Sequence, residues 1–170
     1  MEDSLEGRIM SNALRTLLLL AYVPLACTAD NASQKIPADQ QQAIEKAIMD
    51  VHGKMKQAAE QRDTEALYKY VLEMDKGVII EGGRLQRTRQ EALNSTRQGM
   101  QGLKDLAYTY TQKYVTVISP TVALWVGEGT ASVTLGDGRQ TSAPFVETVV
   151  FVQKEGEWKV LHAHRSTPCR

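Results

Sequence analysis

The chain has 170 residues, of which 42% are apolar, and its 20 Lys and Arg residues balance its 20 Asp and Glu residues. This length and composition predict one folded domain with a single hydrophobic core, and they exclude a disordered, strongly charged protein. The zero net charge argues against a nucleic-acid-binding protein, which needs a basic surplus, and two cysteines are too few for a disulfide framework or a four-thiolate zinc site.

The amino-terminal end carries a short apolar run that predicts a secretory signal peptide over residues 1–29. The run Thr16–Ala26 follows Arg15 and precedes polar residues, which is the order of parts in a signal peptide. Its length is about half of what a membrane-spanning helix needs, and no longer apolar run occurs in the sequence. The leader before Met10 is acidic, unlike the start of a signal peptide, so Met10 is a better candidate for the translation start.

Cys27 gives this leader a second interpretation. Leu25-Ala26-Cys27 resembles a bacterial lipobox, in which the cysteine is acylated and becomes the first residue of the mature protein. Cleavage after Ala29 and a lipid anchor at Cys27 both remain open, and either would export the domain to the periplasm or out of the cell. Residues 30–39 are then a linker, residues 40–167 the folded domain and residues 168–170 a tail.

The first half of the exported part is predicted to be mainly helical. Apolar residues recur every three or four positions from Ala38 to Arg62, which indicates an amphipathic helix. Asp63 is a good cap for a second helix, and Gly77 would end it. A short strand and a third helix are expected to follow, at residues 78–80 and 88–99.

After Gly102 the apolar period changes to two, which predicts long antiparallel strands joined by tight turns. The expected strands are residues 106–118, 121–135, 140–153 and 158–166. A helical first half followed by long strands indicates an α+β fold, with a curved antiparallel sheet wrapped by three helices.

Strict alternation along these strands predicts which side chains share a face. It places Tyr108, Tyr110 and Tyr114 together, and it places His162 and His164 on the face of the last strand opposite Arg165. Tyrosines and histidines on one sheet face are typical of a sheet-to-sheet interface, so we expect a homodimer. The two histidines lack a third ligand nearby in sequence, and we therefore expect neither a metal site nor a cofactor.

The last two strands carry a family resemblance. Glu147-Thr148 and the run Gly156–Ser166 resemble the closing strands of SnoaL-like domains, which belong to the nuclear transport factor 2-like superfamily. They are also similar to the association (hub) domain of calmodulin-dependent kinases. The step Gln61-Arg62-Asp63 between the first two helices matches the usual Asn-Gly-Asp of the superfamily. The resemblance implies a cone with an internal pocket, and commonly a homodimer.

The same resemblance limits the functions to be considered without choosing among them. We expect an exported domain that binds a small, partly apolar molecule in its cone cavity. The alternatives are an enzyme of the cyclase, isomerase or dehydratase type and a non-catalytic oligomerisation module like the kinase hub. The expected partners are a small-molecule ligand and a second copy of the chain, and not a nucleic acid.

Four residues are the candidate ligand contacts, and no catalytic residue is assigned. We expect Trp125 to line the cavity beside two glycines, Tyr70 to approach from the second helix, and Arg165 with Glu147 to supply polarity near the mouth. Arg165 has two interpretations, a bidentate clamp for a carboxylate ligand or a structural ion pair with Glu147 or Glu91. Glu81, before the Gly82-Gly83 turn, is expected to be solvated.

Overall fold

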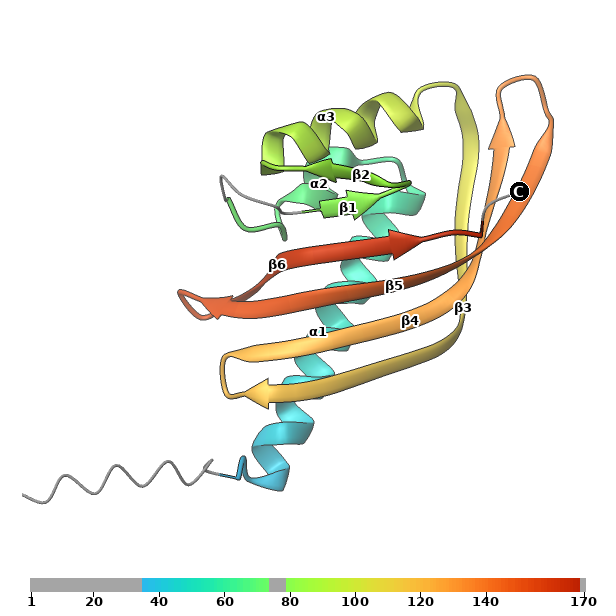
Figure 1. The fold of residues 1–170 in the computed structure, drawn as a ribbon. Coiled ribbons are helices and arrows are strands. Elements are labelled where there is room, and N and C mark those ends of the chain that lie inside the picture. Colours follow the sequence, from blue (N-terminus) through green and yellow to red (C-terminus); the bar gives the residue numbers. More distant parts are fainter. Residues whose placement is uncertain (1–34, 74–78, 169–170) are drawn as a thin grey trace, which may run out of the picture. The chain divides into compact units, whose positions relative to one another are not determined.

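The structure, a computed structural model, describes residues 35–73 and 79–168 (Figure 1). The predicted signal peptide, Cys27 and residues 30–34 of the predicted linker lie outside the described residues. In the part of the chain that is described, no helix combines the length and the apolar character needed to cross a membrane. Along the chain the elements are α1 (Ala38–Glu60), α2 (Thr64–Tyr68), β1 (Ile79–Glu81), β2 (Arg84–Gln86), α3 (Arg89–Met100), β3 (Leu103–Ser119), β4 (Val122–Leu135), β5 (Gln140–Lys154) and β6 (Glu157–Ser166).

Within the described residues, six strands form one curved sheet in the order β2-β1-β6-β5-β4-β3. Neighbouring strands are antiparallel, except that β1 and β6 run parallel. Helix α1 lies across one face of the sheet, and α2 and α3 lie near the β1–β2 hairpin (Figure 1). The predicted α+β fold with a curved, mostly antiparallel sheet is confirmed, with one addition, because strand β2 after the Gly82-Gly83 turn was not expected.

Helix α1 forms where the apolar spacing predicts it, and its buried stripe repeats every four residues. Ile44 and Ile48 are buried in the core, and His52 continues the same stripe one turn later. At the start of α2 the Asp63 carboxylate accepts a hydrogen bond from the Ala66 backbone N–H at 2.9 Å. These caps and stripes are local signals, which is why the starts of both helices match the prediction.

The second helix is shorter than predicted. It ends at Tyr68 because the chain after it pairs with β6 instead of continuing to coil. Tyr70 accepts a backbone hydrogen bond from Val160 at 2.7 Å, and Leu72 donates one back to Val160 at 2.9 Å. Tyr70 therefore lies in the turn that leads from α2 into this pairing, so the prediction that Tyr70 lies on a helix was wrong.

Register shifts interrupt the alternation of the long strands, three in the β3–β4 pairing and one in the β5–β6 pairing. Two of them affect the cavity: one lies between Tyr110 and Gln112 in β3, and at the other Leu161 in β6 has no partner between the pairs formed by Val160 and His162. A bulge adds one residue to one strand, so the side chains beyond it change faces. The face predicted for Tyr114, beyond the β3 bulge, is therefore wrong, whereas His162 and His164 lie opposite Arg165 as predicted.

The bulges decide which aromatic and charged side chains meet inside the cone. Tyr108 and Tyr110 point inward, whereas Tyr114, beyond the first bulge, is 59% exposed on the outer face. On β6 the fully buried Val160 and the cavity residue Arg165 share the inner face, although strict alternation separates them. The expected three-tyrosine outer face therefore does not form.

The core is centred on the middle strands. Its largest fully buried side chains are Trp125, Phe151, Ile48 and Val160. A side chain at Gly127 would collide with the Trp125 indole, and one at Gly129 would collide with the backbone oxygen of Thr109. The prediction that Gly127 makes room for Trp125 is confirmed, while Gly129 allows β3 to approach closely at its bulge.

Candidate functional site

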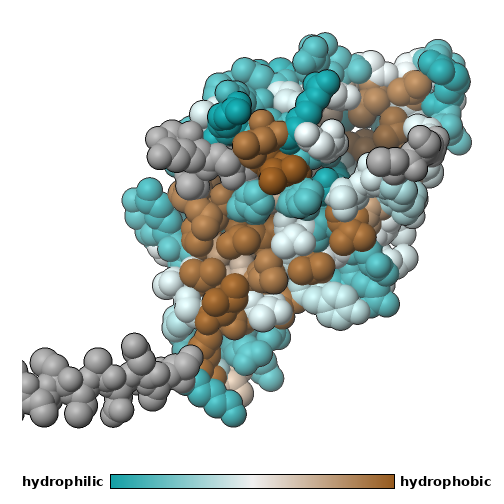
Figure 2. Space-filling model, in the orientation of Figure 1, coloured by the Kyte–Doolittle hydropathy of each residue, from teal (hydrophilic) through white to brown (hydrophobic). Residues whose placement is uncertain are grey.

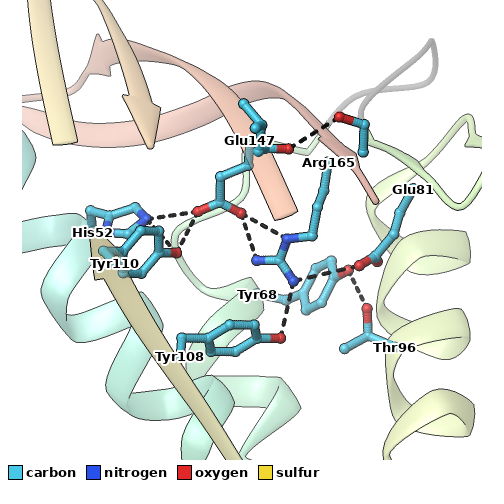
Figure 3. A network of polar contacts seen from close by, with 10 residues as sticks. His52, Tyr68, Glu81, Thr96, Tyr108, Tyr110, Glu147 and Arg165 are labelled. Atoms are coloured by element: carbon cyan, nitrogen blue, oxygen red, sulfur yellow. Dashed lines mark hydrogen bonds and ion pairs between the residues drawn. The ribbon is translucent and has the colours of Figure 1, made fainter. Parts of the chain in front are cut away.

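The helices and the inner face of the sheet enclose a cavity of about 470 Å³. Apolar side chains from every layer line most of it, including Leu67 of α2, Met100 of α3 and Val149 of β5. A cluster of its polar side chains lies where β3, β5 and β6 meet α1, and Tyr68 and Thr96 add a hydrogen-bonded pair from α2 and α3 (Figure 3). The cavity is thus a largely apolar chamber with its main polar cluster, called here the polar wall, on one side, which is the usual form of a small-molecule site.

Glu147 of β5 is the centre of this polar wall. Its side chain is only 8% exposed, and both carboxylate oxygens are bonded (Figure 3). One oxygen lies 3.1 Å from Nε2 of His52 and accepts a hydrogen bond of 2.5 Å from the Tyr110 hydroxyl. The other accepts two hydrogen bonds from Arg165, at 2.9 Å from Nε and 2.5 Å from Nη2. A buried charge with this many partners is held in one position.

These partners keep Glu147 ionised. Burial alone would raise the pKa of Glu147, but the hydrogen bond from His52 and the charge of Arg165 outweigh it and lower the pKa from 4.5 to about 2. Burial and the neighbouring Glu147 charge raise the pKa of Tyr110, so this phenol stays protonated and donates. Although burial disfavours the charged guanidinium, the Glu147 carboxylate raises the pKa of Arg165 and keeps it cationic. Of the two interpretations of Arg165, the ion pair with Glu147 is therefore present.

Aromatic rings fix the other sides of the cluster. The His52 imidazole is stacked on the Trp125 indole, with ring centroids 3.7 Å apart. The Arg165 guanidinium lies over the Tyr108 and Phe145 rings, 4.7 Å and 5.0 Å from their centroids. Stacking of this kind restricts rotation, so the cluster is organised before any ligand arrives.

Tyr108 differs from its neighbour Tyr110 in the use of its hydroxyl group. The Tyr108 oxygen accepts a hydrogen bond of 3.0 Å from Arg165 Nη1. Within the described residues, no side chain or backbone group accepts a hydrogen bond from the Tyr108 hydroxyl, whereas the Tyr110 hydroxyl donates one to Glu147. Tyr108 lines the cavity, so its proton can be donated to a hydrogen-bond acceptor on a ligand.

Two of the four predicted contacts line the cavity and two do not. Glu147 and Arg165 lie in the polar wall, as expected. Trp125 lies behind His52 and supports it, and Tyr70 is replaced by Tyr68, which lines the cavity two residues earlier. The reason is the early end of α2, which turns Tyr68 inward and leaves Tyr70 in the segment paired with β6.

Sequence reasoning missed three residues of the polar wall, His52, Tyr108 and Tyr110. The signal for His52 was present, because it continues the buried stripe of Ile44 and Ile48 at a spacing of four. The two tyrosines were recognised as sharing a face and were assigned to the wrong one. Glu81, expected to be solvated, is half-exposed at the cavity edge, 3.5 Å from Arg165 Nη1.

Comparison with known proteins identifies what this arrangement resembles. The SnoaL-like domain family matches residues 48–170, and no curated protein sequence matches the chain. A provisionally assigned scytalone dehydratase from Novosphingobium aromaticivorans has a similar structure, with a TM-score of 0.71, 14% identity, and coverage of 78% of this chain and 89% of its own. At these identities the likeness shows the fold alone.

Two further solved structures resemble the chain to a comparable degree. A hexachlorocyclohexane dehydrochlorinase gives a TM-score of 0.67 at 15% identity, covering 78% of this chain and 90% of its own. A provisionally assigned association domain of a calcium/calmodulin-dependent protein kinase II from Xanthomonas campestris gives a TM-score of 0.63 at 15% identity. The match covers 71% of this chain and 85% of its own. Proteins described as enzymes and as an assembly domain thus share this fold.

The ion pair at the centre of the cluster predicts a large effect on stability. Glu147→Gln leaves the Arg165 guanidinium without its buried counter-charge, so we expect the free energy of unfolding at pH 7 to fall by about 3 kcal/mol. The matched control Glu65→Gln removes the same charge from an exposed pair with Arg97, and it should cost less than about 1 kcal/mol. Urea denaturation of the three proteins measures both differences, and equal losses would contradict a central role for Glu147.

The same pair predicts how stability depends on pH. Because the pKa of Glu147 is lower in the folded chain than in the unfolded chain, its contribution is fully present above about pH 5 and is lost as the pH falls toward 2. The Glu147→Gln variant lacks this titration. We expect the stability gap between the two proteins to narrow between pH 5 and pH 3 in the same urea experiment.

Proposed function

This chain belongs to the SnoaL-like domain family, and we propose that it works by binding a small, partly apolar molecule in its cone cavity. The observation that carries the proposal is the largely apolar cavity of about 470 Å³ with its main polar cluster on one wall. This volume lies within the range of small-molecule sites, roughly 300–1,000 Å³. A ligand would bury its apolar part against the helices and present its polar part to β3 and β6.

The groups of the polar wall form hydrogen bonds with one another, and this supports ligand binding as the function of the cavity. Glu147, Tyr110 and Arg165 already bond to one another, so the wall is stable without a ligand. The Tyr108 hydroxyl is left to make a directional contact with a ligand. A rigid apolar chamber with one oriented donor binds with little loss of conformational entropy, because few side chains must be ordered on binding.

Co-purification tests this proposal. The protein is isolated from its native host without denaturation, and the small molecules that it releases are identified by mass spectrometry. We expect one compound or one chemical series in stoichiometric amount, and its loss from an Ala131→Phe variant, whose ring fills the cavity beside Tyr108. The control Ser132→Phe places the same ring on the opposite face of β4, and it should retain the compound. Equal retention by both variants would contradict binding in the cavity.

An enzyme of the cyclase, isomerase or dehydratase type is the second candidate function. The observation that favours it is the pairing of His52 with the ionised Glu147 in the cavity wall, an arrangement that orients an imidazole as a general base. Similar structures described as a dehydratase and a dehydrochlorinase add support. In the co-purification experiment, catalysis would appear as different compounds on the unaltered protein and on His52→Gln, since only the first would have converted its ligand.

We also propose that the domain is a homodimer formed through the outer face of the sheet. Figure 2 shows apolar side chains gathered over the middle strands on the face turned away from α1. Val146 on this face is 46% exposed, and Tyr114 and Ile118 are more exposed. Exposed apolar patches of this kind mark interfaces, and burial against a second copy would remove them from water. The open cavity argues against a role limited to oligomerisation.

The dimer proposal predicts opposite results for two matched substitutions. Val146→Lys introduces a charge into the middle of the outer face, and light scattering should then give the mass of a monomer. Leu85→Lys makes the same change at a side chain with 47% exposure on the edge strand β2, and it should leave the dimer intact. A monomeric unaltered protein at high micromolar concentration would refute the proposal.

Export is a third proposal, and it is based on the apolar run Thr16–Ala26 behind Arg15. Amino-terminal sequencing of the protein from its native host should show a mature chain that begins near residue 30 and lacks the leader. If Cys27 is acylated instead, the mature chain begins at that cysteine and intact-mass measurement shows the added lipid. A cytoplasmic protein that still begins at Met1 or Met10 would contradict export.

A further inference from the structure

The guanidinium of Arg165 is shared by two carboxylates from different strands. Glu147 of β5 binds Nε and Nη2, on the side facing the core. Glu81 of β1 lies on the other side, with its Oε1 3.5 Å from Nη1 (Figure 3). The Nη1 atom also donates to the Tyr108 hydroxyl at 3.0 Å. This edge, made by Nη1 and Tyr108, is the part of the cluster that a ligand in the cavity would meet.

The two carboxylates differ in how firmly they are held. Glu147 is 8% exposed and bonded through both oxygens, so it is a fixed part of the wall. The Glu81 side chain is 50% exposed, and its contact with Arg165 is a single long one. An exposed ion pair of this length contributes little to stability. Glu81 therefore affects the electrostatic potential in the cavity much more than it affects the stability of the fold.

The charges around the cavity leave an excess of negative charge at the polar wall. Arg165 faces the two carboxylates of Glu147 and Glu81. Lys56 also lines the cavity, but its ammonium group binds both oxygens of Glu60, at 2.7 Å and 2.8 Å. A ligand carboxylate at this edge would therefore be a third anion beside one guanidinium, and like charges placed together disfavour binding.

An uncharged ligand meets different conditions at the same edge. The Tyr108 proton has no acceptor in the described part of the chain, and Arg165 polarises the hydroxyl by donating to its oxygen. A carbonyl, amide or ether oxygen can accept this proton without bringing a charge near Glu81. The wall thus offers a hydrogen bond to neutral acceptors and electrostatic repulsion to anions.

We propose that Glu81 is the specificity-determining residue of the cavity, serving as an internal carboxylate for Arg165 that excludes carboxylate ligands and selects uncharged hydrogen-bond acceptors. This inference rests on the proposed binding function and assigns its substrate class. It departs from the expectation that Arg165 clamps an anionic ligand, because the arginine is already neutralised. It also gives Glu81 a role that its position before a turn did not indicate.

Two probes of equal shape test the proposal, cyclohexanecarboxamide and cyclohexanecarboxylate at pH 7. The unaltered protein should bind the carboxamide at least ten-fold more tightly than the carboxylate, as measured by NMR titration of the cavity. Glu81→Gln removes the repelling charge and keeps the shape of the side chain. It should strengthen carboxylate binding at least ten-fold and change carboxamide binding less than three-fold. The control Glu65→Gln removes one negative charge outside the cavity and should leave both affinities unchanged.

The outcomes separate this inference from the function on which it rests. If the unaltered protein binds both probes equally, or if Glu81→Gln shifts both affinities by the same factor, Glu81 does not select by charge and only the inference fails. If neither probe binds to either protein at millimolar concentration, the proposed binding function fails together with the inference. If Glu65→Gln reproduces the effect of Glu81→Gln, the selectivity comes from net charge and the assignment to Glu81 is overturned.

Discussion

The ionised carboxylate of Glu147, buried between a helix and the sheet, is the constraint on which the rest of the structure depends. Removing such a charge from water costs several kcal/mol unless other groups replace the lost hydration. Here His52 comes from α1, Tyr110 from β3 and Arg165 from β6, so one carboxylate ties together three elements that are far apart in the sequence. The curvature of the sheet and the path of α1 must both bring these groups together.

This arrangement explains how an open cavity coexists with a stable fold. Because the groups of the polar wall satisfy one another, the rest of the cavity lining can be mostly apolar. Arg165 is bonded within the wall, and Tyr108 and Glu81 lie at its edge. The charged Arg165 is thus a supporting residue of the wall.

The similarity to proteins described as a dehydratase, a dehydrochlorinase and a kinase association domain fits this division of roles. The curved sheet and its helices are shared at only about 15% identity. Function in such a fold belongs to the site and not to the architecture. For this chain the informative features are the ionised Glu147, the stacked His52 and the partly exposed Glu81.

Much of the fold was determined by signals within short stretches of sequence. Apolar spacing placed α1, Asp63 and Thr88 cap the next two helices, and glycine turns separate the long strands. The resemblance of the last strand also placed Arg165 in the cavity and Glu147 beside it. The helix and turn predictions succeeded because each depends on contacts between residues close together along the chain, whereas the placement of Arg165 came from the resemblance.

Only the tertiary structure showed that His52, Tyr108 and Tyr110 complete the polar wall. The bulges at Thr111 and Leu161 reverse the alternation of β3 and β6, and a bulge is defined by pairing with a neighbouring strand that the sequence pattern does not specify. The early end of α2 likewise results from pairing with β6. As a result Tyr68 lines the cavity, where the sequence predicted Tyr70. The sequence by itself determined the elements, and long-range register determined the site, because a shift of one residue moves a side chain from one face of a sheet to the other.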